Sequence, residues 1–360
     1  MFFAVLAYNF ILVGLDLIVL LLIVKQRSWL RCYGALFGHF LAILVLAVMM
    51  VGPSFAGMNL VSYGLFLHLP LVLIAASVIF FSRNRFLAGL TGLIGLLVVG
   101  IAIDAFLVEP YSLEISHHEI VAAKLGEPVR IAVVADLQTD RLGAYERTVF
   151  ERLAEESPDI ILFAGDYLQA GQDSWFELAE RYAAFFEEIG LAAPLGVFAV
   201  GGNTDHSRWT EIFSRVPVTA VKNTHTTRRS NFQITQLSVA DSFDTRLRIS
   251  ESNLFHIVLG HAPDFALGDV DADLLVAGHT HGGQVRIPFW GPIMTMSAVP
   301  RSWAAGLTER PRGGILAVSR GVGMERGDAP RLRFLCRPQL LILDLVPILT
   351  ESNEADSRNR

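Results

Sequence analysis

Cysteine is scarce in this chain of 360 residues, which contains only Cys32 and Cys336. Two cysteines cannot build the disulfide framework that stabilises small secreted domains. Runs of basic residues are also missing, and the net charge is −6. Proteins that bind nucleic acid through its phosphates present clustered lysine and arginine. The composition therefore excludes a disulfide scaffold and predicts no nucleic-acid partner.

Charged residues are few as well, at 18% of the chain, whereas 52% of the residues are hydrophobic. The mean hydropathy of +0.46 is too high for an ordinary soluble domain. Roughly 20 apolar residues suffice to cross a bilayer as a helix. Residues 1–108 are therefore expected to form four transmembrane helices, and three helices with the middle pair wrongly split are the alternative. The expected helices are at about 2–24, 34–56, 58–81 and 86–108.

Basic residues in this region are confined to two of the expected loops. Lys25, Arg27 and Arg31 follow the first helix, and Arg83 and Arg85 follow the third. Loops enriched in lysine and arginine stay in the cytoplasm. We therefore expect a multi-pass protein of the cell (inner) membrane whose remaining chain is extracytoplasmic, in the periplasm if the cell has two membranes.

Three ionisable residues, Asp16, His39 and His68, fall inside the expected helices. Ionisable residues within a membrane suggest a functional site. The simpler interpretation of the two histidines is packing between helices, with Asp16 paired to one of them.

Five short apolar runs beyond residue 108 each end at a side chain that can bind a metal. One such residue would more often be a turn former. Ligand sites of open α/β sheets lie at the carboxyl ends of strands, however, so recurrence at five strand ends predicts one shared metal site. Run 129–135 is followed by Asp136 and Gln138, and run 159–164 is followed by Asp166. Run 196–200 is followed by Asn203, Asp205 and His206. Run 255–260 is followed by His261, and run 273–277 is followed by His279 and His281.

The last of these strand ends reads Gly-His-Thr-His-Gly-Gly-Gln over 278–284. With the four earlier motifs it resembles the calcineurin-like metallophosphoesterase family from about 129 to 345. The segments 314–323 and 333–338 are similar to the end of the membrane-anchored branch of that family. Five ordered motifs make the resemblance specific.

The resemblance implies an N-terminal four-helix transmembrane region followed by an α/β metallophosphoesterase domain at 109–348. That domain is expected to contain two packed mixed β-sheets flanked by helices, with helices at about 143–156 and 175–190. Strands alternate with helices up to about residue 220 and dominate from about 232 onward, which agrees with this fold class. The charged residues 349–360 are expected to be a disordered tail.

The family also implies a site for two divalent metal ions, for which Mn, Fe or Zn would suit mixed nitrogen and oxygen ligands. Its reaction is hydrolysis of a phosphomonoester, phosphodiester or pyrophosphate bond by metal-activated hydroxide attack. The implied partners are a phosphate-containing substrate, with lipid-linked substrates among the candidates, and membrane lipid. By motif, the first ion falls to Asp136, Gln138, Asp166 and His281, and the second to Asp166, Asn203, His261 and His279, with Asp166 as the bridge.

Two positions depart from the family pattern, because Gln138 and Thr204 replace histidines. The histidine at the second position usually protonates the leaving oxygen, and a threonine cannot be an acid near pH 7. His206 could replace it, unless it is an exposed loop histidine. These two replacements favour substrates with a good leaving group. The alternative is that the protein is a degenerate member of the family that binds phosphate or lipid with little or no turnover. The candidate catalytic residues are Asn203, Thr204, Asp205 and His206.

An apolar, aromatic segment at 288–296, together with Trp303, follows the last metal motif. Beside a metal site it would suit a lipid substrate or docking on a membrane surface, and packing on its own domain is the alternative. Some membrane-associated relatives of similar appearance cleave the pyrophosphate of a UDP-linked diacylglucosamine. Because that lipid is made in the cytoplasm, this substrate and the expected orientation exclude each other.

Overall fold

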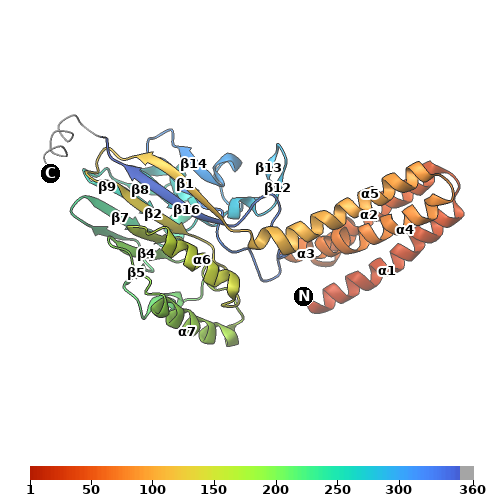
Figure 1. Ribbon diagram of the computed structural model, residues 1–360, viewed down its shortest axis with the longest axis horizontal. Coiled ribbons are helices and arrows are strands. Elements are labelled where there is room, and N and C mark those ends of the chain that lie inside the picture. Colours follow the sequence, from red (N-terminus) through yellow and green to blue (C-terminus); the bar gives the residue numbers. More distant parts are fainter. Residues whose placement is uncertain (349–360) are drawn as a thin grey trace. The chain divides into compact units, whose positions relative to one another are not determined.

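The computed structural model describes residues 1–348, which divide into two compact units (Figure 1). The first unit comprises Met1–Val108 and Glu325–Leu332, and the second comprises Glu109–Met324 and the chain from Arg333. The expected disordered tail, 349–360, lies outside the described residues.

Four apolar helices long enough to cross a membrane form the main part of the first unit, as the hydropathy predicts. They extend over Phe2–Lys25, Trp29–Val51, Phe55–Phe81 and Arg85–Tyr111. Many of their apolar side chains are exposed, which is the arrangement expected of helices surrounded by lipid. The elements are α1 (Phe2–Lys25), α2 (Trp29–Val51), α3 (Phe55–Tyr63), η1 (Gly64–His68), α4 (Leu69–Phe81), α5 (Arg85–Ile103), η2 (Asp104–Val108) and η3 (Glu109–Tyr111).

The second helix begins and ends five residues earlier than the expected 34–56. Its end is set by Gly52, whose φ of 72° favours glycine, and by Pro53, which cannot continue a helix. The next helix begins directly after Ser54, whose side chain accepts a hydrogen bond from the backbone of that helix. Hydropathy alone does not separate this helix end from the following start.

The second unit contains two six-stranded mixed sheets. In the first sheet β2, β3, β4 and β5 run parallel, β16 is antiparallel to β2, and β1 is parallel to β16. Its strands, in spatial order, are β1 (Glu114–Val121), β16 (Gln339–Val346), β2 (Val129–Val134), β3 (Ile160–Phe163), β4 (Gly196–Val200) and β5 (Val218–Val221).

The second sheet has four parallel strands at its centre and an antiparallel strand at each edge. Its strands, in spatial order, are β14 (Gly306–Glu309), β15 (Ile315–Val318), β11 (Leu274–Ala277), β9 (Phe255–Leu259), β7 (Phe232–Gln236) and β6 (His225–Arg228). Two short ribbons complete the strands, formed by β8 (Arg248–Ile249) with β10 (Asp269–Val270) and by β12 (Arg286–Ile287) with β13 (Gly291–Pro292).

A core of branched and aromatic side chains joins the two sheets, with residues such as Leu162 and Phe198 from the first and Ile257 from the second. On the other face of the first sheet lie α6 (Ala144–Glu155) and α7 (Gln172–Glu188), which confirm the two expected helices. The fold is thus two packed mixed sheets with flanking helices, as predicted.

The loops after neighbouring parallel strands remain hydrogen-bonded to one another beyond the strand ends. The Asp136 amide donates to the Gly165 carbonyl at 3.0 Å, and the Gly278 amide donates to the His261 carbonyl at 2.8 Å. These bonds extend the pairing of β2 with β3 and of β9 with β11. Since the two sheets face each other, the polar side chains that follow their strands are brought together.

Candidate metal centre

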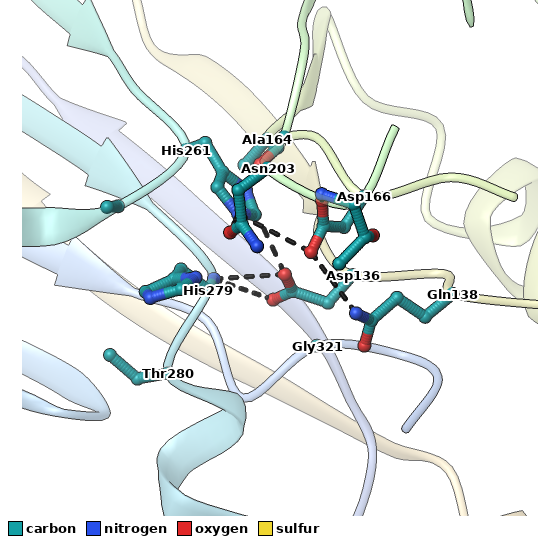
Figure 2. A network of polar contacts seen from close by, with 12 residues as sticks. Asp136, Gln138, Ala164, Asp166, Asn203, His261, His279, Thr280 and Gly321 are labelled. Atoms are coloured by element: carbon teal, nitrogen blue, oxygen red, sulfur yellow. Dashed lines mark hydrogen bonds and ion pairs between the residues drawn. The ribbon is translucent and has the colours of Figure 1, made fainter. Parts of the chain in front are cut away.

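Three side chains from the two sheets meet at the strand ends: Asp136 after β2, Asp166 after β3 and His261 after β9 (Figure 2). One ligand atom from each lies within 4.8 Å of the others, and all three residues are at most 1% exposed. Two carboxylates buried this close together repel each other, and a bound cation offsets that repulsion. The three residues form a metal-binding site.

The imidazole of His261 is oriented as a metal ligand requires. Its Nδ1 lies 2.8 Å from the carbonyl oxygen of Ala164, so Nδ1 carries the proton and donates it there. The lone pair of the neutral ring is then on Nε2, which lies 3.5 Å from Asp166 Oδ2. Tying one ring nitrogen to a backbone carbonyl is how proteins orient a histidine ligand.

Asn203 supplies an oxygen next to this lone pair, because its Oδ1 lies 2.9 Å from His261 Nε2. The Asn203 oxygen and the unprotonated His261 Nε2 are both hydrogen-bond acceptors, so at this distance they repel each other unless both bind the same cation. Ligands about 2.1 Å from an octahedral ion are roughly 3 Å apart along an edge, which matches the observed separation. The residues present therefore fit a divalent metal ion.

Backbone strain marks the same residues. Asp136, Asp166 and His279 have φ values of 50°, 56° and 69°, and Gln138 and His281 also have positive φ. Positive φ is uncommon outside glycine and costs free energy, and such residues cluster at functional sites. This backbone conformation directs the side chains of successive loops toward the metal-binding site.

Glycines leave space for the two carboxylates. A Cβ atom at Gly202 would lie 2.1 Å from Asp166 Oδ1, and one at Gly278 would lie 2.6 Å from Asp136 Oδ2. Neither position accepts a side chain without displacing a carboxylate. The glycines of the Gly-Asn and Gly-His motifs are therefore needed for close approach to the metal-binding carboxylates.

Backbone amides hold the carboxylates in place. The His279 amide donates to Oδ1 and Oδ2 of Asp136 at 3.0 and 2.9 Å, and the Thr204 amide donates to Asp166 Oδ1 at 2.9 Å. The His279 ring lies 5.0 Å from the His261 ring, centroid to centroid, and its Nε2 contacts the Met296 carbonyl at 3.0 Å. Its Nδ1 is thus the nitrogen that can bind a metal.

Gln138 and His281 lie at the site in orientations that favour metal binding less. Gln138 turns its amide nitrogen, not its oxygen, toward Asp166 Oδ2, at 3.2 Å. The Nδ1 of buried His281 lies 3.4 Å from a guanidinium nitrogen of Arg333. Burial, and secondly the charge of Arg333, lower the pKa of His281 well below its usual range. A ligand bound through Nε2 carries its proton on Nδ1, where Arg333 opposes it.

Asp205, expected as a catalytic residue, contacts the backbone. Its carboxylate accepts hydrogen bonds from the amides of Asp166, Tyr167 and Gly202, at 2.9, 2.7 and 2.8 Å. Burial and the Asp166 carboxylate raise the pKa of Asp205, and the three donors act against that shift. The contacts show Asp205 fixing the loop that carries Asp166.

His206 packs on an aromatic pair at the start of α7. Its ring lies 4.4 Å from Trp175 and 5.4 Å from Phe176, centroid to centroid, and its Nδ1 accepts a hydrogen bond from the Arg208 amide. These contacts occupy both the ring face and Nδ1. They give no support to His206 as a replacement for the histidine absent at Thr204.

Arg333, for which the sequence predicts no role, has a completely buried side chain. Its guanidinium donates to the carbonyls of Gly321 and Gly323, at 3.3 Å from Nη2 and 2.9 Å from Nε. The Gly323 amide in turn donates to the Asp136 carbonyl at 2.8 Å. Arg333 thus holds the loop that lies against Asp136. The only signal in the sequence was its place in the 333–338 segment that resembles the family.

Comparison with known proteins agrees with the site. The family Calcineurin-like phosphoesterase matches residues 129–283. The chain is 31% identical over 293 residues to the uncharacterized metallophosphoesterase YkuE of Bacillus subtilis, a match that covers 73% of this chain and 97% of that protein. It is 30% identical over 257 residues to the phosphodiesterase YaeI of Escherichia coli, covering 66% and 90%.

A more distant relative is the UDP-2,3-diacylglucosamine pyrophosphatase LpxG of Chlamydia trachomatis. It is 23% identical over 282 residues, which cover 60% of this chain and 83% of that protein. Fold, metal-binding residues and relatives all agree: this chain is a metal-dependent phosphoesterase and belongs to the calcineurin-like phosphoesterase family.

Proposed function

We propose that this protein is a membrane-anchored phosphoesterase with two divalent metal ions, and that it prefers phosphodiester or pyrophosphate bonds to phosphomonoesters. The observation that carries the proposal is the convergence of Asp136, Asp166 and His261 at the strand ends of both sheets. Bound divalent cations would lower the pKa of a coordinated water and offset the charge of the phosphate oxygens.

Asp166 is the proposed bridge between the two ions. Its Oδ2 lies 3.2 Å from Gln138 Nε2 on one side and 3.5 Å from His261 Nε2 on the other. We assign the first ion to the group with Gln138 and the second to the group with His261, as the family resemblance implies. The full proposed ligand set is Asp136, Gln138, Asp166 and His281 for the first ion and Asp166, Asn203, His261 and His279 for the second.

The preference for good leaving groups rests on Thr204. A hydroxyl cannot give up its proton near pH 7, and His206 is engaged with Trp175 and Phe176. A substrate whose leaving group is already a weak base, such as a phosphate monoester released from a pyrophosphate, needs less protonation.

Thr204→His is expected to restore a general acid. Such an acid contributes about 10²–10⁴-fold, so kcat should rise by at least about tenfold for a methyl phosphodiester, which has a poor leaving group, and little for a nitrophenyl diester. Thr204→Gln is the matched control of similar size without an acid. Equal rises for both substrates, or a rise with glutamine, would contradict a role in leaving-group protonation.

A lipid-linked substrate is proposed from the surface of the β12–β13 ribbon. Two aromatic residues lie between the two strands: Phe289 is fully exposed, and Trp290 is 68% exposed. They line a cavity of about 520 Å³ with Arg286 and Arg301, and the Arg301 guanidinium lies over the Trp290 ring. Apolar side chains beside arginines suit acyl chains next to a phosphate. The relative LpxG is named for a lipid-linked pyrophosphate. Because the UDP-linked lipid of that name is made in the cytoplasm, the orientation proposed below requires a different phosphate-bearing lipid as the substrate of this chain.

The double substitution Phe289→Ser and Trp290→Ser is expected to raise KM for a lipid-linked pyrophosphate in mixed micelles by about tenfold or more. Burial of one such side chain is worth about 1.5–3 kcal/mol, and 1.4 kcal/mol is tenfold in affinity. The rate with a water-soluble nitrophenyl diester should be unchanged. Val121→Ser, at another exposed apolar position, is the control. An unchanged KM for the lipid would contradict the proposal.

The orientation of the protein is proposed from the basic end of the helix bundle. The Arg83 guanidinium donates to the carbonyls of Ile23, Val24 and Gln26 at the end of α1. Both basic loops therefore lie at one end of the bundle, which supports a cytoplasmic position for that end. A reporter fused after Arg360 should then be active only outside the cytoplasm, and cytoplasmic activity would reverse the orientation.

Hydrolysis by the purified full chain tests the proposed function. With added Mn²⁺, bis-nitrophenyl phosphate and a lipid pyrophosphate should be cleaved faster than nitrophenyl phosphate. Cleavage of none of the three would contradict the proposal and favour a protein that binds phosphate or lipid without turnover.

A further inference from the structure

The membrane helices contain a connected polar network that crosses three of the four spans. Asp16 on α1 contacts both histidines: its Oδ1 lies 2.6 Å from His39 Nε2 on α2, and its Oδ2 lies 2.7 Å from His68 Nδ1. The other nitrogen of His68 lies 3.0 Å from Asn9 Oδ1. Packing between helices does not explain why both histidines contact Asp16, the one acid of the first three spans.

The network lies deep in the membrane region. Asp16 is about 14 Å along α1 from Lys25 and about 21 Å from Phe2, at 1.5 Å per residue. His39 and His68 are 2% and 4% exposed. A charge at this depth is costly in a single helix, so ionisable residues persist there when they are paired or functional.

His68 also ends a π-helical turn, η1, which extends from Gly64 to His68 between α3 and α4. Such turns are rare and occur frequently at functional sites. A Cβ atom at Gly64 would lie 2.3 Å from Ile43 Cγ2 and 2.7 Å from the Tyr8 hydroxyl. The glycine thus allows the close approach of three helices that places His68 against Asp16.

Hydrogen-bond directions fix how many protons Asp16 and His68 share. The Asn9 amide nitrogen donates to the Val5 carbonyl at 2.7 Å, so its oxygen faces His68 and accepts from Nε2. His68 Nε2 therefore carries a proton, and another proton lies between His68 Nδ1 and Asp16 Oδ2. This shared proton is bound either to Asp16 or to His68. In both cases the pair holds one proton more than it would if Asp16 were ionised and His68 were neutral.

His39 contributes a neutral ring to the network. Its Nε2 donates to Asp16, and its buried Nδ1 has no hydrogen-bond partner among the described residues. A protonated Nδ1 would lack an acceptor, so the ring is neutral while the Asp16–His68 pair keeps its proton. The network then has no net charge, as an apolar membrane interior requires.

Few other ionisable groups face the network. Tyr8 lies beside it and donates its hydroxyl to the Ile43 carbonyl at 3.0 Å. Between residues 69 and 103 the charged residues are Arg83 and Arg85, both at the basic end of the bundle. Asp104 begins η2, whose Phe106 ring contacts Phe66 of the π-helical turn. Charged residues also occur in 325–332, which belongs to the same compact unit: Glu325, Arg326, Asp328 and Arg331. Asp16 and the two histidines are the ionisable residues that the hydrogen bonds of the network connect directly.

We propose that Asp16, His39 and His68 form a reversible proton-binding site within the membrane, separate from the phosphoesterase centre. The site holds one proton on the Asp16–His68 pair, and His39 is a neutral ring that donates from Nε2 to Asp16. Through Asp16, this site connects helices α1, α2 and the π-helical turn by hydrogen bonds.

The test uses the full chain in lipid nanodiscs, with ¹⁵N-labelled histidine and ¹³C-labelled aspartate carboxyl groups. Signals are assigned with His39→Gln and His68→Gln. At pH 7.5 we expect either a doubly protonated His68 or a protonated Asp16, and a neutral His39 with a bare Nδ1.

Asp16→Asn should leave His68 singly protonated at pH 7.5. Tyr33→Phe, which removes a hydrogen bond to Thr91 elsewhere in the bundle, should leave all three signals unchanged. An ionised Asp16 with both histidines neutral from pH 5 to 9 in the unmodified protein would overturn the proposal.

Discussion

Replacement of Asp166 by asparagine is expected to abolish hydrolysis of every phosphoester substrate. Asparagine keeps the size of the side chain and the hydrogen bond from the Thr204 amide to Oδ1, which is 2.9 Å long. It removes the negative charge that the proposed bridge supplies to both cations. Loss of a residue that only orients a ligand costs about 10–100-fold, so loss of the bridge should exceed that range.

The rate is measured with a nitrophenyl diester under saturating Mn²⁺, so that weaker metal affinity alone does not explain a loss. Asp269→Asn, which removes an exposed carboxylate paired with Arg312, is the control and should retain the full rate. If Asp166→Asn keeps more than about a tenth of the rate, the bridging role is wrong, since even a positioning residue would cost more.

Removal of the Asp205 carboxylate is expected to lower stability as well as activity. Asp205→Ala leaves the amides of Asp166, Tyr167 and Gly202 without their acceptor. An unsatisfied buried donor costs about 1–3 kcal/mol, so the three together should cost roughly 3 kcal/mol or more. For a domain of this size that lowers the unfolding temperature by about 6–12 °C.

The unfolding temperature of the full chain in detergent is measured beside kcat, with Asp173→Ala, an exposed acid on α7, as control. Asp205→Asn separates two roles. A residue that fixes the loop should lose stability with asparagine too, because one of the two acceptor oxygens becomes a donor. An unchanged unfolding temperature with a lower kcat would instead identify Asp205 as a catalytic acid.

The sequence was sufficient to predict the two-sheet fold and the three residues that converge. Short apolar runs ending at Asp136, Asp166 and His261 are local signals, and parallel strands place such residues at one edge. The four long apolar helices were also expected from the sequence, because runs of about 20 apolar residues are typical of helices that span a bilayer and rare in soluble domains.

Contacts between distant residues were beyond the sequence. Nothing local shows that Asp205 accepts from the Asp166 loop, that His206 packs on Trp175, or that Arg333 is buried behind His281. These contacts depend on how loops from different strands pack. The same limit applies to the membrane helices, where the pairing of Asp16 with two histidines depends on the π-helical turn.

Metal content is the most direct test of the central claim that this chain holds two catalytic metal ions. The purified full chain, supplied with Mn²⁺ and freed of excess ion, should contain about two ions per chain by mass spectrometry. Asp166→Asn should contain one or fewer, and Asp269→Asn should contain two. Fewer than one ion per chain in the unmodified protein after Mn²⁺, Fe²⁺ and Zn²⁺ have each been supplied would contradict the account.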